Sequence, residues 1–156
     1  MKNIFKKKNK NENYIKFFGY SGLFPFLLIL IFSTLNKENI NFYSRMMVFY
    51  LSVIITFIGA TYWGVALNLK KNNFFLILFS IFPTIIATII YALDISFSFK
   101  LFLGIILLNL ILIYEKVYLM NHLNDWYLNF RKKLNLLVSA LVLIFIIVIN
   151  HHKGFF

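Results

Sequence analysis

The sequence predicts an all-α fold, a multi-pass transmembrane helical bundle of five helices. Three observations lead to this prediction. First, 61% of the 156 residues are hydrophobic and only 13% are charged, whereas soluble domains carry about 25% charged residues. Second, the chain contains five apolar runs long enough to cross a bilayer as helices, which takes about 20 residues. Third, the period-2 alternation of a membrane β-barrel is absent, so helices must satisfy the backbone in lipid.

Each predicted span is an apolar run bounded by polar or charged residues. A basic cytoplasmic tail, residues 1–16, of which we expect 1–13 to be flexible, precedes the first span, which contains Gly19, Gly22 and Pro25. The fourth span continues past Glu115, where we expect water to reach the carboxylate. The fifth is short but sufficient if little tilted. One membrane domain, 17–150, holds the five spans, and a short tail, 151–156, follows; the spans are residues 17–35, 46–69, 74–93, 101–120 and 134–150.

Lysine and arginine residues divide unevenly between the two sides that five spans define. Twelve lie on the side of the N-terminus and four on the opposite side. The positive-inside rule therefore predicts a cytoplasmic N-terminus and an external C-terminus. A net charge of +11 would suggest nucleic-acid binding in a soluble protein. Because these charges lie beside apolar spans, we expect them to contact the lipid bilayer and its anionic headgroups, with no nucleic-acid partner.

Small residues recur every four positions in the second span, so they share one helix face on which a neighbour can approach closely. They are Ser52, Thr56, Ala60 and Gly64. The third span carries Pro83 and a matching row, formed by Ser80, Thr84 and Thr88. The short connection Lys70–Asn73 makes these spans antiparallel neighbours, so we expect the two rows to pack together. A leucine at Gly64 should then wedge the helices apart. A polar path for a solute is the alternative reading of the hydroxyl row.

Few other side chains point to chemistry. Tyr62 and Trp63 either line a ligand pocket or anchor the helix at the membrane interface. Asn109 either coordinates an ion or bonds to another helix. The acidic residues and histidines lie at the ends of the spans or outside them, and the chain has no cysteine. We therefore predict no catalytic residue, no metal site and no cofactor.

The segment from Glu115 to Lys133 has an apolar face at helical spacing and a basic end. Trp126 and Tyr127 lie within it, as does Arg131, one of only two arginines beside 14 lysines. This pattern predicts an amphipathic helix lying at the cytoplasmic interface. A docking surface for a partner protein is the alternative.

Four segments together resemble a known family. They are GYSGLFPF (Gly19–Phe26), FIGATYWGVAL (Phe57–Leu67), IFPTIIA (Ile81–Ala87) and WYLNFRKKLNLLV (Trp126–Val138). In this order they resemble the bacterial family called domain of unknown function 3429, whose eukaryotic relatives include mitochondrial transmembrane protein 69. The resemblance runs from about Phe17 to Ile149, and the segment in the second span is its most specific part.

The resemblance implies five helices in a bacterial inner membrane and no established activity. It marks as motif positions Gly19, Gly22, Pro25, Gly59, Trp63, Gly64, Pro83, Trp126, Tyr127 and Arg131. The chain departs from the family pattern at Ala60, where a second glycine is usual, and at Tyr62, where a basic or histidine side chain often stands. A role in relatives that depends on titration at this position would be lost here.

Two functions remain open at the level of sequence. The first is a non-enzymatic inner-membrane protein that acts through helix packing and protein contacts, in an assembly or accessory role with a membrane-protein partner. The small-residue rows and the basic segment favour it. The second is a small transporter or channel for a neutral or weakly polar solute, which the proline-bearing spans and the hydroxyl row favour.

Overall fold

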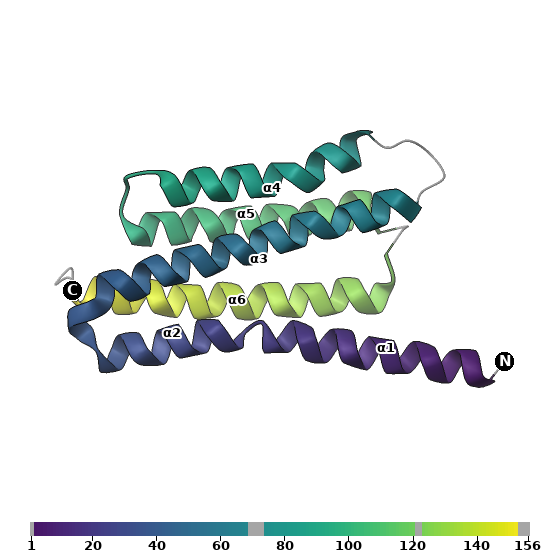
Figure 1. The fold of residues 1–156 in the computed structure, drawn as a ribbon, viewed down its shortest axis with the longest axis horizontal. Helices are drawn as coiled ribbons and strands as arrows, with labels where there is room; N and C mark the ends of the chain where they lie inside the picture. Colours follow the sequence, from purple (N-terminus) through teal and green to yellow (C-terminus); the bar gives the residue numbers. More distant parts are fainter. Residues whose placement is uncertain (1, 69–73, 121–122, 153–156) are drawn as a thin grey trace.

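The computed structural model describes residues 2–68, 74–120 and 123–152, and every regular element within these ranges is helical (Figure 1). The predicted connection Lys70–Asn73 and residues 153–156 of the predicted C-terminal tail lie outside the described residues. The elements are α1 (Lys2–Ser21), α2 (Phe24–Leu35), the 3-10 turn η1 (Lys37–Asn39), α3 (Ile40–Asn68), α4 (Phe74–Ala92), α5 (Phe97–Tyr118) and α6 (Asp125–His152).

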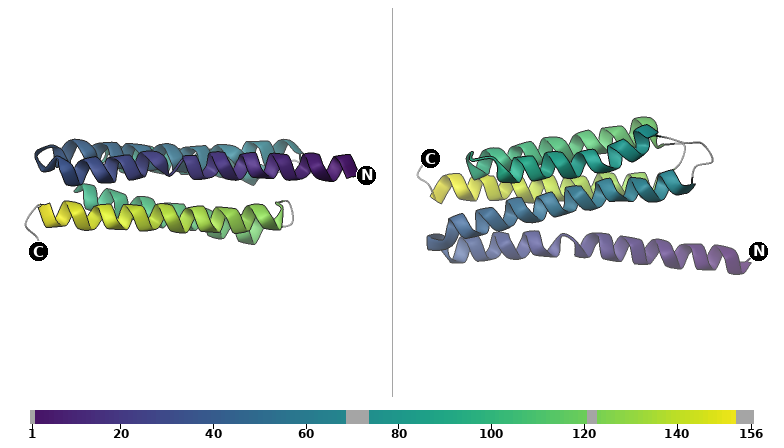
Figure 2. Two further views of the ribbon diagram at one scale, coloured as in Figure 1. Left: turned by 90° about the horizontal axis from the view of Figure 1, so that it is seen from below. Right: turned by 45° about the horizontal axis from the view of Figure 1, so that its top comes forward.

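Five stretches of the described chain are long and apolar enough to cross a membrane, which confirms the predicted multi-pass fold. α1 and α2 together supply the first of them, Asn11–Leu35, and the other four correspond to α3, α4, α5 and α6. The long axes of the helices run side by side, and the start of α1 and the end of α6 lie at opposite ends of the bundle (Figures 1 and 2). This placement agrees with an odd number of crossings.

α3 is the central helix of the bundle. It packs most extensively on α4 and also contacts α5, α2 and α6. α6 closes the bundle by packing on α5 and α2, while α1 touches it more sparsely. The apolar core therefore forms around one face of α3, where Met47, Leu51 and Ile55 are almost fully buried.

The first predicted span is broken into two helices between Ser21 and Phe24. Pro25 lies in the first turn of α2, where a residue without an N–H group is tolerated because that donor would have no helical acceptor. The break leaves the Gly22 carbonyl available, and the Tyr50 hydroxyl of α3 donates a hydrogen bond of 2.9 Å to it. A neighbouring helix thus satisfies the interrupted backbone, as the interior of a membrane requires.

Two sequence predictions about secondary structure are wrong. The predicted flexible tail is helical, and α1 begins at Lys2. The reason is that extending an existing helix outward is far less costly than nucleating a new one. The predicted interfacial helix over Glu115 to Lys133 is not a single helix. Its first residues end α5, and its last nine begin α6, which continues unbroken through the fifth span. A helix need not end where an apolar run ends.

Candidate functional site

Three side chains from three helices form a buried polar centre where the end of α5 packs against the start of α6. Glu115 on α5 is 1% exposed and Arg131 on α6 is 7% exposed. The Nε of Arg131 donates to Oε2 of Glu115 at 3.4 Å. The hydroxyl of Tyr62, from α3, donates to Oε1 of the same carboxylate at 3.3 Å. Both carboxylate oxygens are therefore engaged, by groups that tie α3 and α6 to α5.

The sequence predictions for Glu115 and Arg131 are wrong about their surroundings. Glu115 was expected at the end of a span in contact with water, and Arg131 in a basic interfacial segment. Both are buried because the start of α6 packs against the end of α5. The ion pair between the two side chains compensates for the hydration that each charge loses on burial. One donor group of the guanidinium, Nη2, is buried and has no hydrogen-bond partner among the described residues.

A second polar contact joins α5 and α6 one turn further along. Asn135 is 3% exposed, and its Nδ2 donates to Oδ1 of Asn109 at 2.8 Å. Asn109 in turn donates from Nδ2 to the carbonyl of Ile105 at 2.8 Å. Of the two readings of Asn109, the structure shows the bond to another helix. The Oδ1 of Asn135 is buried and has no partner in the part of the chain that the structure describes.

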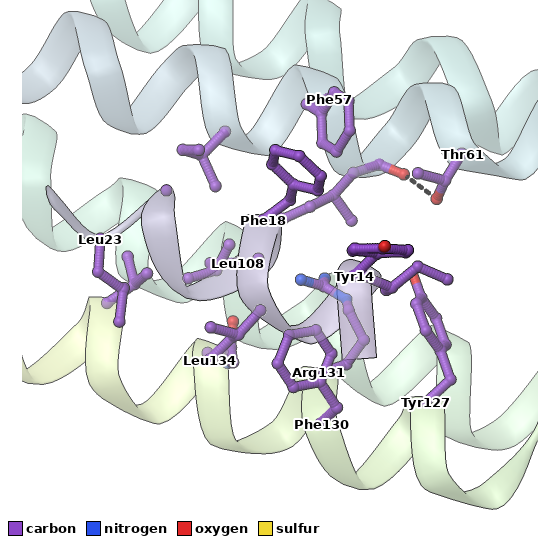
Figure 3. Close-up of a pocket in the computed structure, with 17 residues that line it drawn as sticks. Tyr14, Phe18, Leu23, Phe57, Thr61, Leu108, Tyr127, Phe130, Arg131 and Leu134 are labelled. Atoms are coloured by element: carbon purple, nitrogen blue, oxygen red, sulfur yellow. Dashed lines mark hydrogen bonds between the residues drawn. The ribbon is translucent and has the colours of Figure 1, made fainter. Parts of the chain in front are cut away.

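A cavity of about 500 Å³ opens beside these two side chains, between α1, the break that follows it, α3, α5 and α6. Its wall is mostly aliphatic and aromatic and includes Phe18, Ile54, Leu108 and Val138. Arg131 and Asn135 supply its main polar groups together with Thr61 and Tyr127. Figure 3 shows the Arg131 guanidinium amid the labelled residues that line this cavity. Volumes of 300–1,000 Å³ with a few convergent polar groups are typical of ligand sites.

The contact between α3 and α4 is closed by a different set of residues. A Cβ at Gly59 would lie 2.8 Å from the Ser80 carbonyl oxygen and 3.2 Å from the Pro83 ring. Gly59 therefore allows the proline-containing turn of α4 to approach the α3 backbone. This contact confirms that the second and third spans pack together.

The two predicted rows of small residues do not form this contact along their whole length. Ser52, Thr56 and Thr84 are half-buried and Ser80 is buried, but Ala60, Gly64 and Thr88 are exposed. A Cβ on Gly64 would meet no atom of the described residues within 4 Å. The expected wedge effect of Gly64→Leu is therefore wrong, because α3 turns Gly59 rather than Gly64 toward α4. The Ser80 and Thr88 hydroxyls bond to carbonyls of their own helix.

The remaining motif positions lie near the cavity or at the surface. Gly19 and Gly22 line the cavity, and Gly19 lies directly against the Phe130 ring, which stacks edge-on with Tyr20. The Trp126 ring lies 5.5 Å from the Nζ of Lys16. Trp63 is 54% exposed, which fits the interface anchor better than the pocket. α1 thus contacts α6 mainly through aromatic rings.

Within residues 2–68, 74–120 and 123–152, no group of three or more His, Cys, Asp or Glu side chains is placed to hold a metal ion. The polar centre has one carboxylate, one guanidinium and one phenol. This donor set favours hydrogen bonding to a ligand rather than coordination of a metal.

The model of one protein family, described as "Protein of unknown function (DUF3429)", matches residues 12–148. The chain belongs to this family. The match covers α1 from Glu12 onward and all of the cavity and polar centre. No significant match is found among curated proteins or among solved structures. The relation to mitochondrial transmembrane protein 69 stays a prediction.

Sequence reasoning missed three residues that matter here. Glu115 and Asn135 were not singled out as site residues, and Gly104 was overlooked as a packing position although a Cβ there would lie 2.5 Å from Leu51. A signal for Glu115 was present in the sequence, because it directly follows the uncharged run of the fourth span and α6 carries one of only two arginines. Nothing in the local sequence of Asn135 distinguishes it from the chain's other asparagines.

Proposed function

We propose that the protein is a non-enzymatic accessory protein of a bacterial inner membrane, and that it acts by binding a membrane-soluble molecule in the cavity between α1, α3, α5 and α6. One observation carries the proposal. Arg131 is buried, and its Nη2 group has no partner among the described residues while the side chain lines a largely apolar cavity. An unpaired buried donor is costly, and a bound acceptor would remove that cost.

The polar centre supports binding rather than chemistry. A catalytic carboxylate must reach the group with which it exchanges a proton, but Glu115 is 1% exposed and is not among the described residues that line the cavity. Arginine stays protonated in proteins, so Arg131 is suited to holding an acceptor and not to transferring a proton.

The proposed location follows from the charges. The residues that line the cavity lie mainly on the second half of α1 and the first half of α6, two helices that begin at the same end of the bundle (Figure 1). Most of the basic residues are predicted to lie on this side of the membrane. We place the cavity on the cytoplasmic side by the positive-inside rule. A phosphatase fused after Phe156 should then be active in the periplasm. An inactive fusion would show that the orientation is the reverse of the one proposed.

A role in assembly with a membrane-protein partner is compatible with this proposal, since a bound amphiphile can fill a site at a helix interface. Transport of a neutral solute stays a prediction from the sequence. The hydroxyl row on α4 lends it little support, because Ser80 lies against Gly59 and its hydroxyl bonds to the Ile77 carbonyl.

Native mass spectrometry of the protein extracted from its own membranes in a mild detergent tests the proposal. We expect a non-covalently bound small molecule that survives gentle activation. Ile54→Trp should fill the cavity and remove this molecule, because Ile54 lines it.

The matched control is Val53→Trp on the lipid-facing side of the same helix, where the side chain is 42% exposed. This variant should retain the molecule. Equal occupancy in the two variants, or no bound molecule in the wild type, would contradict the proposal.

A further inference from the structure

The cavity is electrically balanced before any ligand enters it. Among the described residues that line it, Arg131 is the one Asp, Glu, Lys, Arg or His residue, and its charge is matched by Glu115 at 3.4 Å. An anionic headgroup would add a second negative charge to a site with a single buried cation. Burying an uncompensated charge costs far more than burying a neutral hydrogen-bonding group. The charges therefore favour an uncharged headgroup.

The hydrogen-bonding groups on the cavity wall specify what that headgroup must offer. Asn109 donates its Nδ2 to the Ile105 carbonyl, so its Oδ1 is the acceptor toward α6. Asn135 must then use Nδ2 as the donor to that oxygen, since an amide nitrogen donates and an amide oxygen accepts. This chain of bonds fixes the orientation of the Asn135 amide and leaves its Oδ1 as an acceptor with no partner in the described ranges.

Two residues that line the same cavity thus each carry a buried polar atom with no partner among the described residues, one a donor and one an acceptor. The atoms are Nη2 of Arg131 and Oδ1 of Asn135, both more than nine-tenths buried. The two residues are four apart on α6 and so share one face of the helix. A group that satisfies both atoms must accept one hydrogen bond and donate another, which a hydroxyl does. A ketone, an ester or a carboxylate would leave the Asn135 oxygen unsatisfied.

The rest of the wall is suited to a hydrocarbon chain. Ile54, Ile58, Leu108 and Val138 line it, with Phe18 and Leu23 from the α1–α2 side. These side chains offer no hydrogen bond, and burial of a chain against them is favourable in proportion to the apolar area covered.

We propose that the cavity binds a neutral amphiphile whose headgroup carries a hydroxyl, such as an acylglycerol or a long-chain alcohol, with the hydroxyl bridging Arg131 and Asn135. The inference rests on the proposed function, namely that the cavity is a binding site, and it adds the chemical class of the ligand. Arg131 donates to the hydroxyl oxygen, the hydroxyl proton is donated to Asn135, and the hydrocarbon chain lies along α3 and α6.

Three probes with the same chain test the headgroup. Monooleoylglycerol carries hydroxyls, methyl oleate offers only acceptors, and oleate at a pH where it is ionised carries a charge. Binding to the purified full-length protein is measured by titration in a mild detergent. We expect monooleoylglycerol to bind about tenfold more tightly than either of the other probes, the ratio that one well-made buried hydrogen bond supports.

Asn135→Leu should reduce this preference to near unity by weakening monooleoylglycerol alone, with methyl oleate binding unchanged. The wild-type ranking of the three probes needs no variant, so the inference stays testable if Asn135→Leu does not fold. Tighter binding of oleate than of the other two probes would overturn the hydroxyl inference while leaving the proposed function in place. So would equal binding of all three probes, provided that Ile54→Trp abolishes the binding of each. If none of the probes binds and no endogenous molecule is retained, both fail.

Discussion

α3 has two unlike neighbourhoods in this bundle, and the difference separates what holds the protein together from what is available for binding. Toward α4 it presents Gly59, and the backbone of the partner helix lies where a side chain would otherwise be. Toward α1, α5 and α6 the helices leave a cavity of about 500 Å³, and two residues that line it carry buried polar atoms that no described residue satisfies. The first neighbourhood is fixed by shape, whereas the second retains unused capacity for hydrogen bonding.

The contrast teaches that close backbone packing and a polar site are built on one helix without conflict. Membrane helices associate through van der Waals packing and small residues, and interhelical hydrogen bonds add to it. Here the close contact and the cavity lie on different faces of α3, since Gly59 meets Pro83 whereas Ile54 lines the cavity. Substitutions on the two faces should therefore have different consequences.

The largest effect is expected for Arg131→Met in the polar centre. This change leaves the Glu115 carboxylate buried beside a single phenol, and removing one partner of a buried ion pair costs about 3–5 kcal/mol. Thermal unfolding in detergent should show a Tm lower by roughly 10 °C.

The double variant Glu115→Gln/Arg131→Met provides the control for that prediction. Because it removes both charges, its stability should return to within about 1 kcal/mol of the wild type. If the double variant were as unstable as the single one, packing of the arginine stem rather than its charge would be responsible.

Gly59→Leu is expected to have the next largest effect. The new side chain would collide with the Ser80 carbonyl and the Pro83 ring, and overpacking of this kind costs about 1–3 kcal/mol. Gly64→Leu on the same helix is the matched control, since a Cβ there meets no described atom within 4 Å. Equal losses of thermal stability in the two variants would show that the contact with α4 does not depend on Gly59.

Gly19→Ala should be milder than Gly59→Ala, although a Cβ at Gly19 would also overlap a neighbour. The atom that it meets is the end of the Phe130 ring, a side chain beside the cavity that has room to move, whereas Gly59 faces backbone. We expect a cost below about 1 kcal/mol for Gly19→Ala, against about 1–2 kcal/mol for Gly59→Ala. Chemical unfolding of the two variants side by side measures the difference, and the reverse order would mean that the cavity wall is as rigid as the contact with α4.

Asn109→Leu should have the smallest effect. It removes one bond between α5 and α6, and interhelical hydrogen bonds in membranes are worth about 0.6 kcal/mol on average. The binding preference for a hydroxyl headgroup should also fall, because the Asn135 amide is then free to rotate. Comparison of the unfolding curve with the ligand titration separates these two consequences, and an unchanged preference would show that Asn109 does not orient the amide.

Several features of the candidate site could be read from particular residues before the fold was known. Gly19, Gly22 and Arg131 were marked by the family resemblance, and each lines the cavity. Pro83 was marked in the same way and packs against α3. Glu115 was misplaced because the hydropathy of its neighbours gives the depth of a residue along a helix but not the direction in which its side chain points. Gly64 was misplaced for a related reason, since spacing of four defines a helix face but not which neighbour that face meets.

The sequence by itself determined that the protein is an all-helical, multi-pass bundle. Apolar length is a property of each segment alone, and a bilayer demands helices wherever such segments cross it. Only the tertiary structure decided which faces meet. Glu115 and Arg131 are 16 residues apart on different helices, and their pairing depends on how α5 and α6 are rotated about their axes. That rotation is set by packing across the whole bundle, so neither the ion pair nor the cavity beside it is encoded in any local pattern.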